Sequence, residues 1–247
     1  MAAPAVNGLQ IIDEGSGGDP VVFLHGLCGD KETWRAQVDH LKTSRRVVAY
    51  DQRGHGTSAR AANYSIQLLA DDLENLTREL RLNKFWLVGH SMSGAVLSAY
   101  AAKHGDKLAG IIYVDAIGDL SNASPALRKW FMDNEGVDLP KMREAFTGML
   151  GPKAKPQTRE AVFAGLERCD RNAYVQLRED LVAQPAPRLD KVAVKAAIEA
   201  DASDNPFFAS HLPGVKRIEI KGVSHWLMLD DPAALNAALD EVLAWTK

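Results

Sequence analysis

Short apolar runs that end at polar or glycine residues alternate with stretches of helical periodicity along most of the chain. Such uninterrupted runs are typical of strands that are covered on both faces. Apolar residues recur at helical spacing over 66–82, and a second helix is expected to start at or just after Ser91. The alternation predicts βαβ units and a parallel sheet. The runs with this form are Val21–Leu24, 46–50, 85–88 and 109–114.

The C-terminal part of the chain continues the same pattern. Two further apolar runs, 192–200 and 215–220, are expected to be strands, and a closing helix is expected over 232–245. Pro232 suits the first position of that helix, because its missing N–H has no partner to lose there.

One stretch, from Ser121 to Gln184, contains only helical patterns, interrupted by glycines and prolines. It is too long for a simple connection between strands, so we expect a helical insertion. Its many Leu, Met, Phe and Trp residues suit a cap that lies over another surface. We therefore expect a core domain made of residues 1–120 and 185–247, and a helical cap over 121–184.

Composition and charge narrow the functional classes. The 247 residues fit one large α/β domain, and 46% hydrophobic and 25% charged residues are ordinary for globular proteins. A net charge of -3 and the lack of a long Lys/Arg run argue against a nucleic-acid partner. The run 109–114 is far too short to span a membrane, and the N-terminal residues lack a secretory pattern. We expect a cytoplasmic protein that acts on a small molecule, without a membrane partner.

The chain contains two cysteines, Cys28 and Cys169. Two cysteines cannot form a disulfide framework or a common four-ligand zinc site. We expect two separate free thiols, and neither a metal nor an organic cofactor.

The segment from Gly89 to Ser93 follows an apolar run and precedes a helix, which is the context of a nucleophile elbow. A sharp strand-to-helix turn holds the central serine, Ser91, in a strained conformation with its oxygen outward. Small residues are needed two positions before and after it, because other main chain passes close by. The second small residue is Ser93 rather than the usual glycine. On its own, the motif is equally compatible with a chance serine in a glycine-rich turn.

A loop at the end of the run 21–24 supplies a second element. Acyl transfer needs hydrogen-bond donors aimed at the developing oxyanion. We expect the main-chain N–H groups of Leu27 and Met92 to be those donors. The neighbouring His25 is expected to be structural, and Cys28 either lines the pocket or packs as a small buried side chain.

A serine hydroxyl needs a histidine that takes its proton. Of the seven histidines, His225 alone stands at a late strand end, the edge where open α/β sheets place their sites. His55 lies in the glycine-containing turn that starts at Asp51, and we expect it to serve the scaffold.

Together, the stretches 21–115 and 215–245 resemble the α/β-hydrolase superfamily. The resemblance implies a mostly parallel, doubly wound sheet with a helical cap inserted after the sixth strand. It also implies hydrolysis through Ser91, His225 and an acidic residue, without metal or organic cofactor.

Three acidic residues compete for the third position. Most members of the superfamily carry the acid after the seventh strand, where Asp201 and Asp204 stand. Some members place it after the sixth strand, which is the position of Asp115. We prefer Asp115 and keep Asp204, and then Asp201, as alternatives.

The expected function is hydrolysis of a small to medium, largely apolar carboxylic ester through an acyl-enzyme on Ser91. Lactone opening, thioester hydrolysis, carbon–carbon hydrolysis and cofactor-free perhydrolysis are alternatives on the same architecture. A serine at the elbow argues against epoxide hydrolases and dehalogenases, which need an aspartate nucleophile. A function of a different class is that of a small-molecule receptor that retains the triad. The elbow variant with Ser93 in place of glycine resembles that branch of the superfamily.

Overall fold

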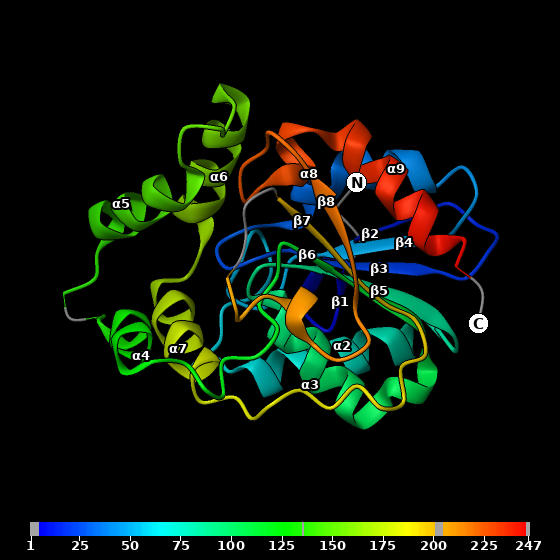
Figure 1. The fold of residues 1–247 in the computed structure, drawn as a ribbon, viewed down its shortest axis with the longest axis horizontal. Coiled ribbons are helices and arrows are strands. Elements are labelled where there is room, and N and C mark those ends of the chain that lie inside the picture. Colours follow the sequence, from blue (N-terminus) through cyan, green and yellow to red (C-terminus); the bar gives the residue numbers. More distant parts are fainter. Residues whose placement is uncertain (1–4, 135, 201–204, 246–247) are drawn as a thin grey trace.

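The computed structural model describes residues 5–134, 136–200 and 205–245 of the chain. Its centre is an eight-stranded sheet with the order β1-β2-β4-β3-β5-β6-β7-β8 (Figure 1). The first two strands are antiparallel to their neighbours, and all pairings from β4 to β8 are parallel. The strands are β1 (Ala5–Val6), β2 (Leu9–Glu14), β3 (Val21–Leu24), β4 (Val47–Tyr50), β5 (Phe85–His90), β6 (Leu108–Val114), β7 (Lys195–Ala200) and β8 (Lys216–Ile220).

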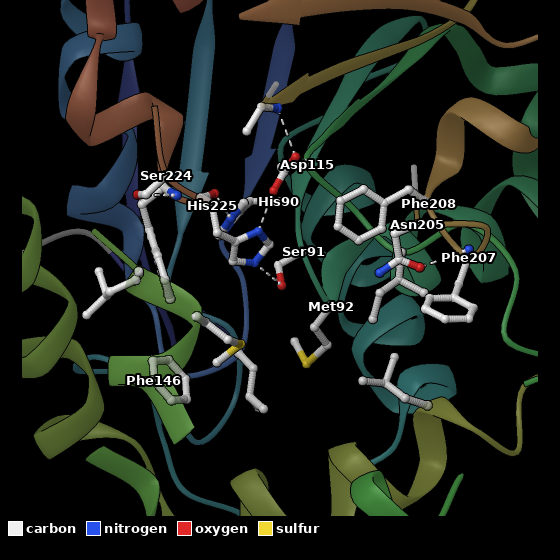
Figure 2. Close-up of a pocket in the computed structure, with 18 of the residues that line it drawn as sticks. His90, Ser91, Met92, Asp115, Phe146, Asn205, Phe207, Phe208, Ser224 and His225 are labelled. Carbon is white, nitrogen blue, oxygen red and sulfur yellow. Dashed lines mark hydrogen bonds and ion pairs between the residues drawn. The ribbon is translucent and has the colours of Figure 1, made fainter. Parts of the chain in front are cut away.

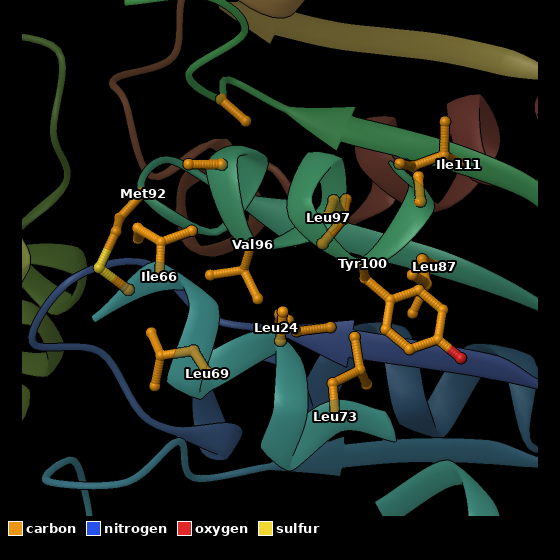
Figure 3. Close-up of a cluster of buried hydrophobic side chains, with 14 of the residues drawn as sticks. Leu24, Ile66, Leu69, Leu73, Leu87, Met92, Val96, Leu97, Tyr100 and Ile111 are labelled. Carbon is orange, nitrogen blue, oxygen red and sulfur yellow. The ribbon is translucent and has the colours of Figure 1, made fainter. Parts of the chain in front are cut away.

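Helices cover both faces of this sheet. The helices α2 (Ile66–Glu79) and α3 (Ser93–His104) pack on one face, where Leu24, Leu87 and Ile111 point towards them (Figure 3). The helices α1 (Arg35–Leu41) and α9 (Pro232–Leu243) belong to the core cluster on the other face. Successive strand residues therefore point into two different apolar layers, which explains why the runs show no alternation. The remaining short helices are α8 (Leu227–Asp230) and three 3-10 turns, Lys31–Trp34, Gly105–Lys107 and Ala209–His211.

Four helices lie between β6 and β7, beside the carboxyl ends of the strands (Figure 1). We call them the cap helices: α4 (Pro125–Met132), α5 (Leu139–Leu150), α6 (Pro156–Arg168) and α7 (Arg171–Leu181). Helix α4 packs on α7, and α5 packs on α6. Side chains at their N-termini explain where several of them begin, since Ser124, Asp138 and Asp170 accept hydrogen bonds from the first turns of α4, α5 and α7. In the described part of the chain, no helix is long and apolar enough to cross a membrane.

The structure confirms the predicted fold class and differs from the sequence analysis mainly at the ends of elements. The helix predicted over 66–82 ends at Glu79, and the closing helix ends at Leu243 rather than 245. The strand predicted over 192–200 starts at Lys195, and the one predicted from 215 starts at Lys216. Strands β1 and β2 were not predicted, because β2 is held in the sheet by antiparallel pairing with β4, a contact between distant segments.

Register between the parallel strands determines which loops meet. Leu24 pairs with Gly89, and Gly89 pairs with Tyr113, so β3, β5 and β6 end side by side. The residues that follow, His25, Ser91 and Asp115, therefore gather at one edge of the sheet.

Candidate active site

Ser91 occupies the turn between β5 and α3, in a left-handed conformation with φ of 54°. Non-glycine residues rarely adopt this conformation, so the surrounding structure must impose it. The Ser91 carbonyl accepts hydrogen bonds from the N–H groups of Gly94 and Ile117, both at 3.0 Å. A Cβ on Gly94 would lie 2.0 Å from the Ile117 oxygen, so this position requires glycine.

Ser93, which stands where the elbow motif usually has glycine, is buried. Its Oγ donates a hydrogen bond of 2.5 Å to the main-chain oxygen of His25 and accepts one of 3.2 Å from Gln52 Nε2. The hydroxyl therefore connects the serine turn to the loop after β3. This contact explains the departure from the usual motif.

His225 lies between Ser91 and Asp115 (Figure 2). Its Nε2 is 2.8 Å from Ser91 Oγ, and its Nδ1 is 2.6 Å from Asp115 Oδ2. Because an ionised carboxylate only accepts hydrogen bonds, Nδ1–H is the donor to Asp115 and Nε2 accepts from the serine hydroxyl. Asp115 is buried, and its other oxygen accepts a hydrogen bond of 3.0 Å from the N–H of Ala200. The three residues form one continuous hydrogen-bonded chain.

Asp115 has a φ of 42°, so it shares the strained backbone region with Ser91. Its N–H donates to the Ile198 carbonyl at 2.8 Å, which holds the turn against β7. The two alternative acids, Asp201 and Asp204, lie outside the described residues.

His90, to which the sequence analysis assigned no role, supports the position of His225. Its Nε2 donates a hydrogen bond of 2.9 Å to the His225 carbonyl, and the two ring centroids are 4.5 Å apart. Burial, reinforced by the neighbouring His225, holds the pKa of His90 well below its usual value. His90 is therefore a neutral donor. Its place inside the elbow motif was the available signal.

Asp230 anchors the other side of the His225 loop and was also missed. Its Oδ2 accepts from the N–H and Oγ of Ser224, at 2.8 and 2.5 Å. Its Oδ1 accepts from Lys155 N–H at 3.0 Å and from Thr158 Oγ at 2.7 Å, both in the cap segment. Burial raises the pKa of Asp230, but these hydrogen bonds outweigh burial and lower it overall. One ionised carboxylate thus joins the His225 loop to α6.

The loop after β3 is held by His25, whose structural role the sequence analysis expected. His25 Nε2 accepts a hydrogen bond of 3.0 Å from Gln52 N–H, so Nδ1–H donates to the Gly26 carbonyl at 2.7 Å. Burial, followed by the nearby His55, lowers the pKa of His25 to about 4, so the ring is neutral. A Cβ on Gly26 would lie 3.0 Å from Ser91 Cβ, so glycine allows this loop to approach the serine closely.

The two residues expected to stabilise an oxyanion, Leu27 and Met92, both line the pocket that contains Ser91. Within residues 5–134, 136–200 and 205–245, no main-chain or side-chain hydrogen bond is donated by either N–H. Both groups are thus available to a ligand.

The pocket around Ser91 has a volume of about 740 Å³ and lies between the strand ends and the cap helices. In Figure 2, Phe146 lies on one side of Ser91 and Met92, and Phe207 and Phe208 lie on the other side. Most of the lining is apolar, and it includes Leu27, Leu120, Leu127, Met149, Leu150 and Trp226.

Cys28 and Cys169 are free and buried, but they are not separate as expected. Together with His55 they offer three ligand atoms that lie within 4.8 Å of one another. Two thiols and an imidazole are ligands for zinc or copper ions. The two cysteines meet because the segment between α6 and α7 packs on the loop after β3, which no local sequence pattern indicates.

Comparisons with known proteins agree with this architecture. Residues 21–238 match the model of the alpha/beta hydrolase family. The chain is 28% identical over 141 residues to the sn-1-specific diacylglycerol lipase ABHD11 of Danio rerio, which covers 56% of this chain and 44% of that protein. It therefore spans less than half the length of that relative.

Two further proteins match over almost the whole chain. The 2-succinyl-6-hydroxy-2,4-cyclohexadiene-1-carboxylate synthase of Klebsiella pneumoniae is 26% identical over 253 residues, covering 94% of this chain and 97% of that protein. The solved structure of a thermophilic esterase from Thermogutta terrifontis (malate bound) superposes with a TM-score of 0.82 at 24% identity, covering 98% and 96% of the two chains. By its family match and its fold, the chain belongs to the alpha/beta hydrolase family.

Proposed function

We propose that this chain is a serine hydrolase that cleaves carboxylic esters through an acyl-enzyme on Ser91. The observation that carries the proposal is the chain of hydrogen bonds of 2.8 and 2.6 Å from Ser91 through His225 to Asp115. The three residues line a largely apolar pocket that is large enough for a small to medium ester.

The first half-reaction forms the acyl-enzyme. His225 Nε2 takes the hydroxyl proton as Ser91 Oγ attacks the ester carbonyl carbon. The Asp115 carboxylate stabilises the imidazolium that forms, and the N–H groups of Leu27 and Met92 stabilise the oxyanion. His225 then protonates the leaving alkoxide, and the alcohol departs.

The second half-reaction releases the acid. His225 takes a proton from a water molecule, whose oxygen attacks the acyl carbon, and then returns the proton to Ser91 Oγ. The positions of His25 and His90 support this cycle, because both are neutral donors that hold main chain rather than compete for the proton.

We also propose that residues 121–184 act as a cap domain that selects the substrate. The cap helices contribute Phe146, Met149 and Leu150 to the pocket, which favours apolar acyl or alcohol groups. Differences of one methylene group change such preferences by about 1–3 kcal/mol.

The receptor hypothesis has no separate support in the site. That hypothesis was based on Ser93. The hydrogen bond from Ser93 to the His25 carbonyl gives this serine a structural role, which is compatible with an enzyme as well as with a receptor. A panel of aryl esters, thioesters and lactones separates the hypotheses. Absence of turnover across the panel, despite fluorophosphonate labelling at Ser91, would support the receptor.

The direct experiment is pre-steady-state kinetics with 4-nitrophenyl butanoate. We expect rapid release of 4-nitrophenol and an acyl adduct on Ser91 that intact-protein mass spectrometry detects. Ser91→Ala should abolish both, whereas the matched control Ser44→Ala, at a serine that does not line the pocket, should retain both. Equal turnover by wild type and Ser91→Ala would refute the assignment.

A further inference from the structure

Arg178, on helix α7, is only 6% exposed and lines the same pocket as Ser91. Three aromatic rings surround its guanidinium. The carbon Cζ lies 4.5 Å from the ring centroid of Trp130, 5.1 Å from that of Tyr174 and 5.8 Å from that of Phe131. Rings on the faces of a guanidinium leave the in-plane N–H groups for hydrogen bonds.

The hydrogen-bond partners of Arg178 are all neutral. Its Nη1 donates to Tyr174 Oη at 2.5 Å, its Nη2 donates to the Trp130 carbonyl, and its Nε donates to the Phe131 carbonyl at 3.4 Å. A guanidinium has five N–H donors, so these bonds leave one on each Nη. The bonds also attach α7 to the last turn of α4, which fixes the orientation of the group.

Among the described residues, no carboxylate compensates this charge. In the described part of the chain, Arg178 takes part in no ion pair, although other arginines of the cap do, as Arg143 does with Glu167 at 2.8 Å. Asp115 is the acidic residue among the described residues that line the pocket, and its oxygens already bind His225 and Ala200. A buried charge without a counter-charge is unfavourable, so this arginine is poised for an anionic group from outside the chain.

We infer that Arg178 binds a carboxylate of the substrate, and that the enzyme acts on esters that carry a carboxylate separated from the ester group by a hydrocarbon spacer. The planar carboxylate accepts the two remaining N–H groups in the plane of the guanidinium. The apolar lining of the same pocket, which includes Phe146 and Met149, fits the spacer. This inference rests on the proposed ester hydrolysis and names its substrate class.

The test compares anionic esters with neutral esters of the same shape. On the acyl side, the 4-nitrophenyl monoester of adipic acid is compared with 4-nitrophenyl hexanoate. On the alcohol side, 4-acetoxybenzoate is compared with its methyl ester. The variants are Arg178→Met and Arg178→Lys, with Arg143→Met as the control, because Arg143 also lies over an aromatic ring of the cap, Phe163, but does not line the pocket.

We expect the wild type to prefer one of the anionic esters. Arg178→Met should raise KM for that ester by about 10-fold to 100-fold, the range expected for hydrogen bonds to a charged group, and should change the KM of its neutral partner little. Arg178→Lys, which keeps a positive charge, should retain part of the preference for the anionic ester over its neutral partner. Arg143→Met should behave as the wild type. If Arg178 had a purely structural role, Arg178→Met would instead change the KM values of both esters equally and lower the melting temperature.

Binding measured without turnover separates this inference from the proposed function. Isothermal titration of Ser91→Ala with adipate monomethyl ester should show binding that Ser91→Ala/Arg178→Lys weakens. If no ester is turned over but this binding is seen, the hydrolase proposal fails and the carboxylate site stands. If the wild type hydrolyses neutral esters at least as well as both anionic ones, and the titration shows no binding, the inference is overturned. These two measurements do not use Arg178→Met, so they test the inference even if that variant does not fold.

Discussion

Ser93 Oγ donates a hydrogen bond of 2.5 Å to the main-chain oxygen of His25, and this contact joins the nucleophile turn to the loop that carries Leu27. The two segments are 68 residues apart in the sequence, and each supplies one of the proposed oxyanion donors. The distance between those donors therefore depends on a side chain that the usual motif lacks.

Replacing this side chain should loosen the site. We expect Ser93→Ala to lower stability by about 1–2 kcal/mol, because a buried hydrogen bond is lost and Gln52 loses an acceptor. We expect kcat to fall several-fold while KM changes little, since the oxyanion forms only in the transition state. Urea unfolding and steady-state kinetics measure the two effects. Ser93→Gly, the residue of the usual motif, should not restore kcat, and full activity in it would contradict the proposed linkage.

Asp115 should be the acid of the triad. In Asp115→Asn, the amide cannot hold His225 in the tautomer with hydrogen on Nδ1, so we expect kcat to fall by about 10³-fold to 10⁴-fold. Circular dichroism and the melting temperature check that the variant folds. Asp201→Asn and Asp204→Asn serve as controls, and each should retain activity within about twofold. A large loss in Asp204→Asn together with an active Asp115→Asn would assign the role to Asp204.

His90 should act as a positioning residue for His225. His90→Phe keeps an aromatic ring but removes the hydrogen bond to the His225 carbonyl, so we expect kcat to fall about tenfold. Because His90 is already neutral, the acidic limb of the pH profile should keep its midpoint. A shift of that midpoint in His90→Phe would show that His90 titrates with the reaction.

Acid should destabilise the protein partly through His25. The pKa of His25 is about 4 in the folded protein and near 6.5 in the unfolded chain, so the unfolded state binds more protons between these values. The contribution of His25 to stability is therefore fully present above pH 6.5. It is lost as the pH drops towards 4, and the loss is about 3 kcal/mol at most.

Urea unfolding at several pH values between 4 and 7 measures this contribution. His25→Gln should have lower stability at pH 7 but a smaller loss on acidification than the wild type. In the control His40→Gln, which removes a half-exposed histidine paired with Asp240, the free energy of unfolding should fall with decreasing pH as steeply as in the wild type. An unchanged slope in His25→Gln would show that other groups account for the acid sensitivity.

The sequence by itself determined those features that depend on local backbone requirements. Apolar runs followed by polar residues are enough to identify β3, β5 and β6, because strands covered on both faces need uninterrupted apolar residues. The turn at Ser91 and the loop after β3 can also be identified from the sequence, because small residues such as Gly26 and Gly94 are required where other atoms pass close to the main chain.

Only the tertiary structure decided which distant groups meet. Asp115 and His225 are 110 residues apart, and their contact depends on the parallel pairings that place β7 between β6 and β8. The packing of the cap and the strand-end loops decides, in the same way, the roles of His90 and Asp230 and the meeting of the two cysteines. It also buries Arg178 without a counter-charge among the described residues. No local pattern specifies such contacts, because each of them joins segments that are distant in the sequence.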